Sequence, residues 1–174
     1  MAQIIFAPTK AGDLTNISSQ SPASGEHWDK VVSDDASYVY NSSGTYQSDL
    51  YGYDPIVRGG RINFVRVTCL YKNNAQGRWS YCTPALKSHA TIYYGTESSG
   101  DRYTGYYTTY TNWLMNPYTG SLWSWSEVYE AQFGASIKLA AAGGGFIAQL
   151  GKVAMTVDYT VENVKIGLID IGMM

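Results

Sequence analysis

The stretch RINFVRVTCLYKNNAQGRWSYCTPALK, residues Arg61–Lys87, decides the fold of this chain. β-Branched and aromatic residues dominate its first half, which predicts a strand over Arg61–Lys72. The alternation of apolar and polar residues breaks at Phe64-Val65, and we interpret this as a strand covered on much of both faces. NNAQG predicts a turn, after which RWSYCTPALK is expected to return antiparallel, with Pro84 at a sheet edge or a bulge.

Strand-like segments of the same kind recur along the whole chain, separated by turn residues. They are QIIFAP (3–8), SYVYNS (37–42), SDLYGYDPI (48–56), HATIYYGTE (89–97), YYTTYTNWL (106–114) and KVAMTVDYTV (152–161). The segment 9–27 is rich in Ser, Gly and Pro and is expected to be a polar loop packed over the surface or used as a contact arm. About eight to ten short strands predict an all-β fold, an antiparallel jelly-roll β-sandwich, as a single domain over residues 1–174.

One helix is expected in this chain of strands. Ser124 and Glu127 have the S-x-x-E spacing of a capping box, so the pattern predicts a short helix at about 124–133 that ends at Gly134. Trp125 and Phe133 lie on its apolar stripe and are expected in the core, because a helix of two turns must be held by burial.

Composition and charge narrow the classes of function. The chain has 174 residues, 45% of them apolar and only 15% charged, and its net charge is −2. Lys and Arg are scattered, so nucleic acid is not expected as a partner. No apolar run is long enough for a membrane span and no signal peptide is evident, which predicts synthesis in a cytosol. Cys69 and Cys82 flank the predicted turn, so a cross-strand pair is geometrically possible, but two buried or half-buried thiols are the expected state.

Catalytic and metal-binding patterns are weak. Asp34-Asp35 could offer oxygens to calcium, but no calcium loop surrounds them. Glu97, Asp101, Glu127 and Glu130 are carboxylates without a spacing that pairs them for glycoside hydrolysis. Gly143–Gly145 lacks the residues of a phosphate loop. We therefore expect no enzyme activity, no metal and no cofactor.

Two groups of residues are candidates for contact with partners. The first is an aromatic group that could form a ligand or partner surface, although alternation along a strand means that its members cannot all share one face: Tyr103, Tyr106, Tyr107, Tyr110, Trp113, Tyr118 and Trp123. The second lies in the apolar ends of the chain, which are expected to pair in a sheet or to lie on a neighbouring subunit: Ile4, Ile5, Phe6, Ile166, Leu168, Ile169 and Ile171. Residues 162–174 are thus a candidate C-terminal strand or assembly arm.

Four stretches in order resemble a family of β-sandwich proteins from the virion gene clusters of tailed bacteriophages and prophages. They are Ile4–Val31, Asp34–Tyr40, Asn116–Ile137 (with N-P-x-T-G before the capping box) and Lys152–Val161. The chain departs from the pattern at Ser124, where Thr is usual, in AAAGGGFIAQLG (140–151) and in the tail Glu162–Met174. The resemblance implies a lectin-like jelly roll that is a structural or decorating component of the virion, and it carries no catalytic residues.

Two functions follow as hypotheses. The first is a non-enzymatic virion structural protein (a capsid decoration, tail, collar or fibre-associated component) that contacts itself and other virion proteins. The alternative is a lectin-like carbohydrate-binding module for surface glycans, because jelly rolls are shared by lectins although a fold does not determine a function.

Overall fold

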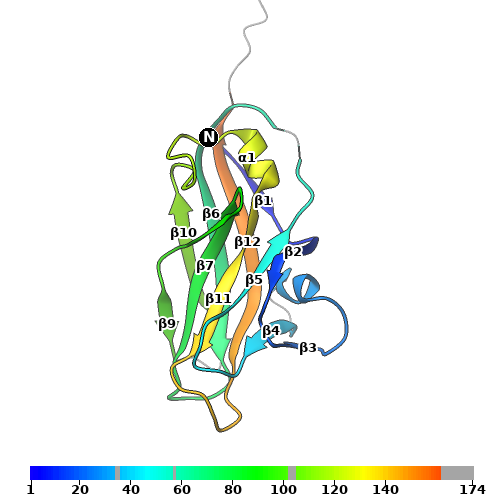
Figure 1. Cartoon of the computed structure of the whole chain (residues 1–174), viewed down its shortest axis with the longest axis vertical. Helices are drawn as coiled ribbons and strands as arrows, with labels where there is room; N and C mark the ends of the chain where they lie inside the picture. Colours follow the sequence, from blue (N-terminus) through cyan, green and yellow to red (C-terminus); the bar gives the residue numbers. More distant parts are fainter. Residues whose placement is uncertain (34–35, 57, 102–104, 162–174) are drawn as a thin grey trace, which may run out of the picture.

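Two antiparallel β-sheets packed face to face make up the part of the chain that the computed structural model describes, residues 1–33, 36–56, 58–101 and 105–161 (Figure 1). The first sheet contains, in spatial order, β10 (Tyr107–Trp113), β6 (Arg61–Asn73), β12 (Ala148–Thr160), β4 (Tyr38–Asn41) and β3 (Ser19–Ser21), and β1 (Ala2–Phe6) also pairs with β12. The second contains β2 (Lys10–Thr15), β5 (Gln47–Gly52), β11 (Gln132–Leu139), β7 (Ser80–Ser88) and β8 (Thr91–Tyr94), and β9 (Ser98–Gly100) also pairs with β7.

The order of the strands is that of a jelly roll. Along the chain, β4, β6, β10 and β12 enter the first sheet, whereas β5, β7, β8 and β11 enter the second. Their spatial orders, β4-β12-β6-β10 and β5-β11-β7-β8, are two interleaved Greek keys, which is the jelly-roll arrangement. The predicted fold class, an all-β antiparallel sandwich with one short α-helix, is confirmed for the described residues.

The predicted pairing around the NNAQG turn is wrong. β6 and β7 follow each other in the chain but lie in opposite sheets, because the turn carries the chain across the sandwich. Cys69 and Cys82 are accordingly two buried free thiols, one on each sheet. Pro84 lies neither at an edge nor in a bulge: it pairs with Ala135 of β11, and on its other side it falls between the residues that pair with β8 and with β9. Proline, which has no backbone N–H, is tolerated at this position because no neighbouring strand requires a hydrogen-bond donor from it.

The broken alternation in β6 has a different cause from the predicted double covering. Phe64 pairs with Asp158 and Ile62 with Tyr159, so the register shifts at Asn63 in a β-bulge. After the bulge, β6 alternates regularly and turns Val65, Val67, Cys69 and Tyr71 into the core. Facing side chains of β11 and β12, including Phe133, Ile137, Val153 and Met155, fill the space between the sheets.

The capping box is confirmed, but the helix is shorter than predicted. The backbone N–H of Glu127 donates to Ser124 Oγ at 3.3 Å, and the Ser124 N–H donates to Glu127 Oε2 at 2.8 Å. The helix, α1, covers Trp125–Glu130, and the chain is already extended at Ala131. Gly134 is therefore no helix cap; it lies inside β11, where a Cβ atom would collide with the carbonyl oxygen of Asp49 on β5.

The predicted polar loop 9–27 contains strands instead. β2 pairs with β5 and β3 pairs with β4, and the 3-10 helix η1 (His27–Val31) follows. The buried carboxylate of Asp49 holds this arm: Oδ1 accepts from the N–H groups of Asn16 and Ile17, both at 2.8 Å, and Oδ2 lies 2.6 Å from His27 Nδ1. Burial raises the pKa of Asp49, and these partners oppose that shift.

The position of Gly134 generates a test of the corrected helix end. We expect Gly134→Ala to lower the free energy of unfolding by about 1–3 kcal/mol, because the added Cβ must displace the β5 backbone. Gly134→Asn should cost more than Ala, since it is larger, whereas a helix cap in the left-handed region would tolerate Asn better. Urea unfolding would measure both variants. Gly59→Ala, where a Cβ meets nothing within 4 Å, is the matched control.

Candidate functional site

The predicted aromatic surface does not form one patch. Tyr110 is exposed on the outer face of the first sheet, with the Arg66 guanidinium 4.5 Å from its ring centroid. Tyr118 is exposed elsewhere and stacks on His89 with ring centroids 4.2 Å apart. Tyr106 is half-buried, with the Lys72 ammonium 4.6 Å from its ring centroid.

The remaining members of that group belong to the interior or lie outside the described residues. Trp123 is only 5% exposed, and its indole N–H donates to the carbonyl of Trp113 at 3.0 Å, so assigning it to a surface is wrong. Trp113 and Tyr107 are half-buried against the core, where Tyr107 stacks on Tyr71. Tyr103 lies outside the described residues.

The predicted assembly residues also fall into two sets, those that the structure places in the fold and those that lie outside the described residues. β1 pairs with β12 of its own chain, from Ala2 opposite Tyr159 to Phe6 opposite Met155. Phe6 is buried in the core against Tyr53, Ile4 is half-buried, and Ile5 is exposed. Ile166, Leu168, Ile169 and Ile171 lie outside the described residues, as do Asp34 and Asp35.

One end of the sandwich, which we call the α1 end, gathers several segments. It consists of α1, the start of β1, the end of β12, residues 53–56 and 58–60, and the loop 114–122 (Figure 1). Trp125 of α1 donates its indole N–H to the carbonyl of Gly60 at 2.8 Å and packs edge-on against Tyr159. Gly60 in turn lies against the backbone of Thr160, the last residue of β12.

Exposed apolar side chains are concentrated at the α1 end. Seven of the twelve large apolar side chains that are exposed among the described residues lie there, which makes this end unusual for a water-facing surface: Met1, Ile56, Leu114, Met115, Tyr118, Leu122 and Val161. The loop 114–122 is held rigidly, because Asn116 is buried and its backbone N–H donates to the carbonyl of Ser121 at 2.8 Å. The apolar side chains of this loop, Leu114, Met115, Tyr118 and Leu122, are thus presented on a hydrogen-bonded frame.

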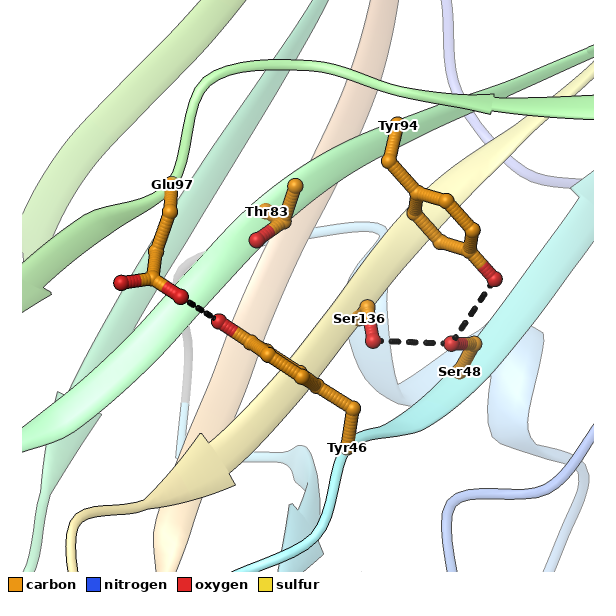
Figure 2. A pocket seen from close by; sticks show the side chains of 6 residues that line it. All are labelled: Tyr46, Ser48, Thr83, Tyr94, Glu97 and Ser136. Carbon is orange, nitrogen blue, oxygen red and sulfur yellow. Dashed lines mark hydrogen bonds between the residues drawn. The ribbon is translucent and has the colours of Figure 1, made fainter.

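A pocket of about 370 Å³ lies on the outer face of the second sheet (Figure 2). Its floor is a row of hydroxyl groups on three neighbouring strands, since Ser136 of β11 pairs with Ser48 of β5 on one side and with Thr83 of β7 on the other. Alternation points these side chains outward, because their neighbours Ala135 and Ile137 point into the core. The volume falls within the range of small-molecule pockets, roughly 300–1,000 Å³.

Two tyrosines and one carboxylate line the walls of this pocket. Tyr46 donates its phenol O–H to Glu97 Oε2, and Tyr94 places its hydroxyl 3.4 Å from Ser48 Oγ (Figure 2). Burial and the bond to Glu97 raise the pKa of Tyr46 to about 12, so this phenol remains a donor at neutral pH. Ser48 Oγ donates to Ser136 Oγ at 2.8 Å. We call this site the Tyr46–Tyr94 pocket.

The chemistry of the pocket is that of hydrogen bonding and ring contact. Glu97 is the single carboxylate in its lining, whereas glycoside hydrolysis uses two. Among the described residues, no group of three or more His, Cys, Asp or Glu side chains is placed to hold a metal ion. Within that same part of the chain, no helix has the length and apolar character needed to cross a membrane.

The sequence singles out Tyr94 as one of many tyrosines and Glu97 as one of four carboxylates, but it does not bring them together. The hydroxyl residues of the floor carry only a weak local signal, a small hydroxyl residue between buried neighbours, as in GASIK around Ser136 and YCTPA around Thr83. No family model, curated protein or solved structure matches this chain. The α1 end and the Tyr46–Tyr94 pocket are the two candidate functional surfaces of the described residues.

The burial of Trp123 predicts a larger loss of stability on substitution than at an exposed aromatic residue of the same loop. Trp123→Ala should lower the free energy of unfolding by about 3–5 kcal/mol, because it removes a buried indole and its hydrogen bond. Tyr118→Ala, in the same loop but exposed, should cost about 0.5–1.5 kcal/mol through the lost stacking on His89. Urea denaturation would measure both, and similar small losses would contradict the burial of Trp123.

Proposed function

We propose that this chain is a non-enzymatic structural protein of a virion, made in the host cytoplasm, which assembles with copies of itself and with other virion proteins. The observation that carries the proposal is the concentration of exposed apolar side chains at the α1 end. A concentration of exposed apolar side chains on one part of a protein surface is typical of a site of contact with another protein. The jelly-roll fold and the ordered resemblance to virion proteins support the same class.

The C-terminal segment of a second copy is the occupant that best suits this surface. β12 ends at Thr160 within the α1 end, which also carries the exposed side chain of Leu122, and residues 162–174 follow in the sequence. That segment is largely apolar, with Glu162, Lys165 and Asp170 as its charged residues. Exchange of this segment between two α1 ends would cover apolar surface on both copies.

Light scattering of the purified chain across a concentration series tests the proposal. We expect a mass that rises with concentration to a stable oligomer. Deletion of 162–174 and the double substitution Leu114→Ser/Leu122→Ser should each weaken association at least tenfold, because each removes one side of the apolar contact. Thermal midpoints of the dilute monomers should stay close to that of the parent, since Leu114 and Leu122 are exposed.

Tyr110→Ser is the matched control for the double substitution. Tyr110 is 54% exposed, the same as Leu122, but it lies on the outer face of the first sheet. It should leave the mass unchanged. A parent chain that stays monomeric at every concentration would contradict the proposed self-assembly. So would an oligomer that survives Leu114→Ser/Leu122→Ser, or one that Tyr110→Ser abolishes equally.

A further inference from the structure

The Tyr46–Tyr94 pocket has the features of a ligand site that self-assembly does not need. It lies on the outer face of the second sheet, among β5, β11 and β7, whereas the apolar contact proposed above lies at the α1 end. We propose that this pocket binds one ring of a neutral carbohydrate. The hydroxyl floor, the aromatic walls and the single carboxylate carry this inference.

The floor offers hydroxyl groups that can both donate and accept. Ser48, Ser136 and Thr83 are nearly buried as residues, yet their side chains face the pocket in a row set by the strand register. Ser136 Oγ accepts from Ser48, and its own proton can be donated to a bound group. Sugar hydroxyls need donors and acceptors in close succession, which such a row provides.

The walls add apolar contact and a charged acceptor. Tyr94 is 52% exposed and Tyr46 is 40% exposed, so their rings present apolar surface to the pocket while their hydroxyls remain polar. The C–H face of a sugar ring can pack on such a ring. The Glu97 carboxylate, exposed at the rim, has acceptor capacity beyond its bond with Tyr46 and can accept from sugar hydroxyls.

The same groups disfavour other classes of ligand. An anionic ligand would meet Glu97, and no cationic side chain lines the pocket; Lys138 instead places its ammonium 4.3 Å from the Tyr46 ring centroid. A peptide strand would need free backbone groups. β5 and β11 are paired on both sides near the floor, and the gap between β8 and β9 along β7 spans only Thr83 and Pro84, which is too short for an added strand. Recognition must therefore use side chains, and these suit a neutral polyol ring.

Ligand-observed saturation-transfer NMR on the full chain tests this inference. The probes are D-glucose, D-galactose, D-mannose, N-acetyl-D-glucosamine and L-rhamnose at millimolar concentration, with N-acetylneuraminic acid as the anionic counterpart. We expect transfer to at least one neutral sugar and none to the acid. Tyr94→Ala, Thr83→Val and Glu97→Gln should each weaken binding at least tenfold. They remove, respectively, a ring, a hydroxyl of the floor and a charged acceptor.

Tyr110→Ala is the matched control, because Tyr110 is as exposed as Tyr94 but lies on the other sheet. It should bind the same sugar as the parent. Absence of transfer to all five neutral sugars would overturn the inference, as would binding that survives Tyr94→Ala and Thr83→Val. Light scattering on the same variants separates the two proposals: pocket variants should keep the mass of the parent, so loss of sugar binding and loss of assembly are distinguishable.

Discussion

The pairing of β6 with β12 is the constraint on which the rest of this sandwich depends. Each strand has 13 residues, and their register runs from Asn73 opposite Ala148 to Arg61 opposite Thr160. β10 attaches to β6, and β1 and β4 attach to β12, so the first sheet is built on this pair. The two strands come from distant parts of the chain, so pairing them closes a long loop and costs conformational entropy. That cost is offset only when the inner faces of both strands are buried in the core.

That pair also determines where the two candidate surfaces lie. β12 runs toward the α1 end, which brings Tyr159 against Trp125 and leaves Val161 exposed at that end. On the opposite layer, β11 sits between β5 and β7, and its register sets three hydroxyl residues side by side. The two proposed surfaces thus lie on separate parts of one frame, and no residue named for one belongs to the other.

The sequence predicts the elements of this fold better than their partners. Alternating apolar residues indicated most strands, and the spacing of Ser124 and Glu127 located the start of α1, because both are local patterns. Sheet membership is not local, so β7 was expected beside β6 and lies across from it. Trp123 belongs by sequence to the candidate aromatic surface, yet it is buried and its indole N–H donates to the Trp113 carbonyl. The pocket was not predictable, since only the register brings Ser48, Thr83 and Ser136 together.

The location of the α1 end has a consequence for how many copies act together. β1 begins and β12 ends there, whereas the Tyr46–Tyr94 pocket takes no residue from that end, so copies joined at the α1 end would keep their pockets out of the joint. Each Tyr46–Tyr94 pocket would then meet a repetitive surface together with its equivalents. In such an arrangement, binding by one copy raises the effective concentration of the next, and avidity can exceed the single-site affinity by roughly 10²–10⁴-fold. A particle that carries many copies would then bind tightly even if the affinity of each single pocket were weak.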